Sequence, residues 1–237
     1  MFNLITPKTL FGMGLVASSA IALSAGSAQA LSITAQANTP FSTVEGARTI
    51  TFDNAVIGSL DGAGYTHESG VSYRGIGGNI VTDSVGGKYA APPSQGDYDN
   101  ANNPYLTVGS YNTQELVIDF GVESDYFGFY FGSIDDYNNL FFYNGDELIA
   151  SLTGKDIREN ANGDQSVNGA RFVNIFAEEG ENFDKIIFQS NKKAFETDNH
   201  AYRLANPEAV PTPAAVLPIL SGLFAVAKRR KQDDTAE

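Results

Sequence analysis

Short segments with the alternation of β-strands fill the second half of the chain, and residues typical of turns lie between them. Residues 115–120 alternate apolar and polar side chains, and residues 126–131 are aromatic on both faces, as a central strand of a sandwich can be. Residues 140–143 and 147–150 flank the turn 144–146, whose Asn-Gly pair is the strongest short-range signal for a β-hairpin. These segments predict antiparallel strands rather than helices.

Further segments have the pattern of strands. They are residues 49–52, 71–73, 80–82, 171–176, 185–188 and 201–202. Helical periodicity is almost absent, apart from one short helix expected at 156–160, so the connections that a parallel sheet needs are missing. We therefore predict an all-β fold, an antiparallel β-sandwich with a jelly-roll-like topology, over residues 48–205. Residues 31–47, which are rich in Ser, Thr, Ala and Gln, are predicted to form a flexible lead-in.

The charge of this region excludes several classes of partner. Apart from the two terminal segments, residues 31–206 hold 24 acidic and 10 basic residues, a net charge of −14. Nucleic acids and anionic membrane surfaces need a basic patch, so neither is an expected partner. The chain has no cysteine, which excludes disulfides and thiolate metal sites, and it is long enough to bury a core without them.

The first thirty residues have the layout of a secretory signal peptide. Lys8 precedes an apolar stretch at 10–23, and the small residues Ala28 and Ala30 mark a cleavage site after Ala30. The alternative is a permanent N-terminal membrane helix, which the small residues 24–27 disfavour. Export through the secretion machinery is therefore expected.

The far end of the chain combines a proline-rich spacer at 206–213, an apolar run at 214–227 and a cationic segment at 228–237. Fourteen helical residues span about 21 Å, whereas the hydrocarbon core of a bilayer is about 30 Å thick, so the run is a weak membrane anchor. The cations after it resist translocation. We expect a transient membrane association that leaves the preceding domain outside, rather than an ordinary C-terminal helix packed on the domain.

This C-terminal arrangement resembles a class of bacterial sorting signals. It contains the motif Val210-Pro211-Thr212-Pro213-Ala214, the apolar run, and cations that include Arg229 and Arg230. These features are similar to PEP-CTERM sorting tails in their PTPA variant. The resemblance implies that the protein is exported, processed by an exosortase-type membrane protease, and then released or attached at the cell surface.

The domain carries a second resemblance, which covers most of residues 50–203. Its motifs are residues 51–54 at the start, 126–135 with 139–143 in the middle, and 195–199 with 201–202 at the end. Together they resemble a family of exosortase-dependent surface proteins of bacteria, cyanobacteria in particular. Membership implies an exported β-sandwich whose biochemical role is unassigned.

The sequence contains few of the patterns that are typical of catalytic sites. His67 and His200 are the only histidines, too few for a His-rich zinc site, and the nucleophile-elbow pattern Gly-x-Ser-x-Gly does not occur. A glycoside hydrolase needs two carboxyl groups roughly 5–9.5 Å apart, a spacing that no sequence shows. We predict a non-enzymatic protein, with a secreted hydrolase acting on polysaccharide as the alternative.

Two Asp-Asn pairs are candidate calcium ligands. Asp53 and Asn54 close the first predicted strand, and Asp198 and Asn199 open the last one. First and last strands commonly lie side by side in jelly-roll modules, and calcium binds carboxylate and amide oxygens. A calcium ion here would tie the ends of the domain together and stabilise it. The alternative is that these residues serve only as turn formers.

The loop 133–139 between two aromatic strands is a candidate carbohydrate site. Asp135, Asp136, Tyr137 and Asn138 combine carboxylates and an amide, which hydrogen-bond sugar hydroxyls, with a ring that can stack on a sugar. A solvated connection between strands is the alternative. On this basis, and by analogy of fold, we predict a structural or adhesive component of the cell surface or extracellular polysaccharide that binds carbohydrate with calcium support.

Overall fold

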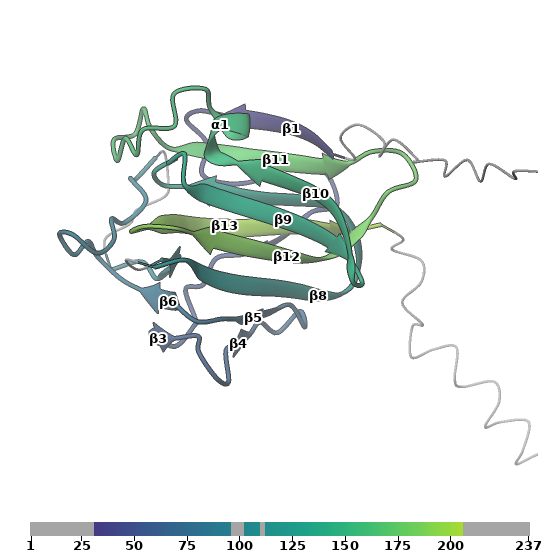
Figure 1. The fold of residues 1–237 in the computed structure, drawn as a ribbon, viewed down its shortest axis with the longest axis horizontal. Coiled ribbons are helices and arrows are strands. Elements are labelled where there is room, and N and C mark those ends of the chain that lie inside the picture. The colour runs from purple at the N-terminus through teal and green to yellow at the C-terminus, as the bar shows by residue number, and fades with distance from the viewer. Residues whose placement is uncertain (1–30, 96–101, 110–111, 206–237) are drawn as a thin grey trace, which may run out of the picture.

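The computed structural model describes residues 31–95, 102–109 and 112–205 (Figure 1). The segments predicted as signal peptide, spacer, membrane run and cationic end lie outside these ranges. Within them, no helix is long and apolar enough to cross a membrane. The strands are β1 Leu31–Gln36, β2 Arg48–Ile50, β3 Gly58–Ser59, β4 Tyr65–Thr66, β5 Ser72–Arg74, β6 Gly78–Val81, β7 Tyr105–Val108, β8 Gln114–Phe131, β9 Asn138–Asn144, β10 Glu147–Thr153, β11 Arg171–Ala177, β12 Phe183–Ser190 and β13 Phe195–Leu204, and the helix is α1 Gly154–Ile157.

The 18-residue strand β8 belongs to both layers of the fold. Its first half pairs with β12 and β5, and its second half pairs with β11 and β13. One layer therefore has the order β4-β5-β8-β12-β9-β10, and the other β1-β11-β8-β13-β7-β6-β3, with β2 also paired to β13. Figure 1 shows the short strands β3 to β6 gathered on one side of the molecule, away from β1 and β11. These pairings are antiparallel, which confirms the all-β sandwich prediction.

Strand β8 is aromatic on both faces of its second half because both faces are covered. Phe127 and Phe129 face the core between the layers, whereas Tyr126 and Tyr130 belong to a second apolar cluster. Val44 packs against that second cluster, so the chain before β2 covers the outer face of the layer. The two segments predicted as separate strands at 115–120 and 126–131 are thus one continuous strand.

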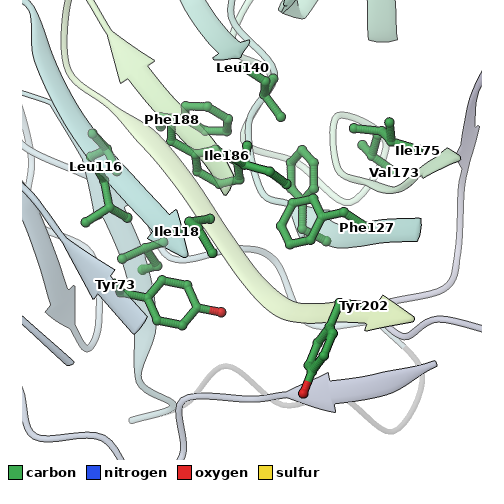
Figure 2. Close-up of a cluster of buried hydrophobic side chains, with 14 of the residues drawn as sticks. Tyr73, Leu116, Ile118, Phe127, Leu140, Val173, Ile175, Ile186, Phe188 and Tyr202 are labelled. Carbon is green, nitrogen blue, oxygen red and sulfur yellow. The ribbon is translucent and has the colours of Figure 1, made fainter. Parts of the chain in front are cut away.

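The main core lies between the two layers and is rich in phenylalanine. Phe188 of β12 has its ring centroid 5.3 Å from that of Phe129 in β8 and 4.6 Å from that of Phe195 in β13. Figure 2 shows Phe188 and Ile186 of β12 in the same cluster as Phe127 of β8. All of these side chains are buried, so the core closes without disulfides.

The structure corrects the prediction of a flexible lead-in at 31–47. Leu31–Gln36 forms β1, which pairs along its whole length with β11, and the Leu31 side chain is buried. The physical reason is that β1 is an edge strand, so most of its polar side chains face water while its backbone hydrogen-bonds β11. The sandwich therefore includes Leu31–Gln36, ahead of the predicted boundary at residue 48.

The expected hairpin and the expected helix are both present with adjusted bounds. Strands β9 and β10 pair around Asn144 and Glu147, as the Asn-Gly turn predicts. The helix occupies Gly154–Ile157 instead of 156–160, because Asp156 caps its start by accepting hydrogen bonds from the backbone and side chain of Thr153.

Candidate functional site

A pocket of about 630 Å³ lies where β13 begins and where the chain leaves β8. Segments that are distant in the sequence line it. They are residues 84–90, the loop residues Ser133, Asp135 and Tyr137, residues 162, 163 and 165, and residues 192–194 with Glu196. The volume is within the range of small-molecule sites, about 300–1,000 Å³.

Glu196 lies at the base of this pocket and accepts hydrogen bonds from two of the segments that line it. Its side chain is 2% exposed. Oε1 accepts a 2.8 Å hydrogen bond from the backbone N–H of Ala90, and Oε2 accepts one of 2.8 Å from the Ser133 hydroxyl. Burial raises the pKa of Glu196 to about 7, although these hydrogen bonds act to lower it.

Asp135, in the loop after β8, is half-buried and lies against Gly163. A Cβ atom at Gly163 would lie 2.5 Å from Asp135 Oδ1, and the backbone of Gly163 has a φ of 69°, so this position favours glycine. Burial raises the pKa of Asp135, while the hydrogen bond from Tyr137 acts to lower it.

Tyr137 contacts both an acidic residue, Asp135, and a basic residue, Lys192. Its hydroxyl lies 2.7 Å from Asp135 Oδ2 and 2.8 Å from the carbonyl oxygen of Lys193, and it shares its single proton between these acceptors. Lys192 Nζ lies over the ring, 4.9 Å from its centre. Burial, followed by the hydrogen bond to Asp135, raises the pKa of Tyr137, so the phenol stays protonated at neutral pH.

The structure brings two of the four predicted carbohydrate residues into the pocket. Asp135 and Tyr137 line it. Asp136 is exposed and its carboxylate lies 3.5 Å from Lys155 Nζ. Asn138 is buried and its Oδ1 accepts a 2.9 Å hydrogen bond from Ser190 Oγ, so it joins the strands instead of lining the pocket.

Sequence reasoning did not identify Glu196, Lys192 or the wall 84–90 as parts of a site. Glu196 lies in the segment 195–202 with a second acid, Asp198, so the sequence alone did not distinguish it. Lys192 and Lys193 are the only two adjacent cations between residues 31 and 206. The wall 84–90 has no comparable signal, since its contribution depends on a contact with a residue 106 positions later.

The two Asp-Asn pairs proposed for calcium have different surroundings. Strands β2 and β13 do pair, as expected, but Asp53 and Asn54 are exposed while Asp198 and Asn199 are buried. Asp198 accepts hydrogen bonds from the Asn103 side chain and from the backbone N–H of Asn199, and Asn199 Nδ2 donates to Pro40. In the described residues, no three Asp, Glu, His or Cys side chains are grouped to hold a metal ion. A calcium site that uses the Asn side chains stays a prediction.

Neither histidine lines the pocket. His200 is 1% exposed, with Nε2 lying 2.9 Å from Thr197 Oγ1 and Nδ1 lying 3.3 Å from the Tyr73 hydroxyl. Its ring packs edge-on against Phe52 and Phe127. Burial lowers the pKa of His200 to about 3, so it is a neutral part of the core.

The sequence matches no family model and has no significant match among curated proteins. Two solved structures show a distant similarity. The K2 cleaved adhesin domain of Lys-gingipain has 10% identity and a TM-score of 0.40, with 67% of this chain and 99% of that chain covered. CpGH89CBM32-6 produced by Clostridium perfringens has 10% identity and a TM-score of 0.31, with 54% and 94% covered. At these TM-scores the similarity carries no conclusion about what this chain binds.

Proposed function

We propose that this protein binds carbohydrate in the pocket formed by Asp135, Tyr137 and Glu196, as an adhesive or structural component outside the cell. The observation that carries the proposal is the placing of an aromatic ring, a half-buried carboxyl group and a set of amides around one cavity. Sugars present apolar faces and many hydroxyls, so a site for them needs a flat ring and several hydrogen-bonding groups. Asn162 and Gln165 supply exposed amides at the rim.

The external location in this proposal rests on the two terminal segments. A signal peptide ending at Ala30 would start the mature chain at Leu31, which is the first residue of β1. The tail 206–237 would be recognised by an exosortase-type protease after a transient stay in the membrane. Extracellular polysaccharide is then the carbohydrate that the protein would meet.

A secreted hydrolase is the second candidate, and one specific observation favours it. Glu196 and Asp135 are two carboxyl groups in one pocket, and the pKa of Glu196 is raised to about 7, as the general acid of a glycoside hydrolase requires. Both oxygens of Glu196, however, already accept hydrogen bonds, and the side chain is 2% exposed. Because a general acid must reach the glycosidic oxygen, we propose binding without catalysis.

The test of the proposal is a glycan array probed with the full chain and two variants. Tyr137→Ala removes the stacking ring and should weaken binding by about tenfold. Tyr143→Ala is the matched control, because Tyr143 also lies under a lysine, Lys185, but does not line the pocket. Absence of glycan binding, or equal binding by the Tyr137→Ala variant, would contradict the proposal. Release of reducing sugar that Glu196→Gln abolishes would favour the hydrolase.

A further inference from the structure

The pocket concentrates positive charge in a strongly acidic domain. Residues 31–206 carry a net charge of −14, and they contain five lysines. Three of these five, Lys88, Lys192 and Lys193, line this one pocket. The other two lie outside it: Lys155 contacts Asp136, and Lys185 donates to the carbonyl oxygen of Gly145.

The lysines reach the pocket from two separate segments. Lys88 lies in a tight turn in which its N–H donates to the carbonyl oxygen of Val85, and its side chain is exposed. Lys192 comes from the connection between β12 and β13, and its ammonium group lies over the Tyr137 ring. A ligand stacked beside Tyr137 would therefore meet a cation at the ring.

The local cations outweigh the distant acids for a ligand in the pocket. At physiological ionic strength the Debye length is about 8 Å, so charges spread over the rest of the domain are largely screened there. The pocket lining holds two acids, Asp135 and Glu196, beside the three lysines. Glu196 is buried with both oxygens hydrogen-bonded, and Asp135 accepts a hydrogen bond from Tyr137. Lys88 and Lys192, whose side chains are exposed, remain to meet a ligand at the rim.

We propose that the ligand of this pocket is an acidic sugar, one that carries a carboxylate or sulfate group, bound with that group at Lys192 and Lys88 and with its ring beside Tyr137. The inference rests on the carbohydrate function proposed above and narrows it to anionic polysaccharides. Charge-assisted hydrogen bonds are about twice as strong as neutral ones. The lysines should therefore determine most of the selectivity for charged over neutral sugars. Tyr137 and the amides would then recognise the rest of the sugar.

The experiment compares charged sugars with neutral partners of the same backbone. Oligogalacturonate is paired with its methyl ester, and dextran sulfate with dextran, and binding to the full chain is measured by calorimetry at two salt concentrations. We expect binding of at least one charged member, about tenfold weaker or absent binding of its neutral partner, and weaker binding at higher salt. The two pairs distinguish a carboxylate from a sulfate ligand.

Two variants assign the effect to the pocket. Lys192→Gln should reduce affinity for the charged sugar by about tenfold. Lys185→Gln is the matched control, since Lys185 also lies over a tyrosine, 5.0 Å from the centre of the Tyr143 ring, and is outside the pocket. It should leave the affinity unchanged.

The outcomes separate this inference from the function on which it rests. Equal binding of charged and neutral sugars that is lost in Tyr137→Ala would overturn the acidic ligand and keep the carbohydrate site. Equal loss in the Lys192→Gln and Lys185→Gln variants would show non-specific charge attraction and would also overturn it. Failure to bind any carbohydrate would overturn both proposals.

Discussion

Ser133 Oγ donates a 2.8 Å hydrogen bond to Oε2 of Glu196, and this contact joins the loop after β8 to the start of β13 at the base of the pocket. A backbone hydrogen bond connects the same two segments, since Gly132 N–H donates to the Glu196 carbonyl oxygen at 3.0 Å. The position of Asp135 and Tyr137, which follow Ser133 in the same loop, thus depends on a buried carboxyl group.

Glu196 should make the protein less stable as the pH rises. Its pKa is about 7 in the folded chain, above the ordinary glutamate value of 4.5, so between these values the folded state holds the extra proton. Its stabilising contribution is therefore present below pH 4.5 and is lost as the pH rises through 7, by about 3 kcal/mol in total. Glu196→Gln should remove this loss, which urea unfolding of both proteins at pH 5 and pH 8 would measure. An equal change in the free energy of unfolding between pH 5 and pH 8 in both proteins would contradict the assignment to Glu196.

His200 should have the opposite effect. Burial lowers its pKa to about 3 from 6.5, so between these values the unfolded chain binds a proton that the folded chain does not. The contribution of neutral His200 to the free energy of unfolding is fully present above pH 6.5. It decreases as the pH is lowered, by about 2 kcal/mol at pH 5. His200→Gln should lower the melting temperature at pH 7 and make it less sensitive to acid. A melting temperature as acid-sensitive as that of the wild type would exclude His200 as the cause.

Gly163→Ala should damage the pocket, whereas Gly180→Ala should not. Both glycines have positive φ, 69° and 89°, so both substitutions incur a similar backbone strain of about 1–2 kcal/mol. Only at Gly163 would the new Cβ atom lie within 3 Å of the Asp135 carboxyl group, and nothing lies within 4 Å at Gly180. Calorimetry should show weaker glycan binding for Gly163→Ala alone, and equal affinities would contradict the role of this contact.

Phe188→Ala should be strongly destabilising because its ring fills the space between the two layers. Removing a buried phenylalanine costs about 3–5 kcal/mol, through lost burial and the cavity left behind. Phe188 is fully buried and its ring is stacked on that of Phe195, with the planes 11° apart. Leu148→Ala on β10 is the control, since Leu148 is 49% exposed and should cost less than about 1 kcal/mol. Guanidinium unfolding at constant pH measures both values.

The strands were predictable where their pattern is local. Residues 171–176 and 185–188 are each short runs rich in β-branched and aromatic residues, and the Asn-Gly turn sets the hairpin of β9 and β10 without reference to the rest of the chain. Strand β1 was missed because its sequence, Leu-Ser-Ile-Thr-Ala-Gln, has the composition of a linker. Only its pairing with β11, about 140 residues away, makes it a strand.

The pocket was half predictable for the same reason. Asp135 and Tyr137 stand out in sequence because acids, amides and an aromatic ring follow one another in a single loop. Glu196 and Lys88 meet that loop only after the strands have paired, so no local pattern could have joined them to it. Asp136 and Asn138 alternate with Asp135 and Tyr137 along the chain, and they have other partners, a salt bridge at the surface and a buried hydrogen bond.

Strand β13 extends from Phe195, next to the pocket, to Leu204, one residue before the last described residue. A mechanical load between a glycan held in the pocket and the tail beyond residue 205 would run along this strand. The hydrogen bonds that β13 forms with β8, β7 and β2 lie across the direction of that load, because antiparallel bonds are perpendicular to the strands. Shear would therefore stress them together rather than one after another, and the domain would resist pulling through a strand that is bonded to three others.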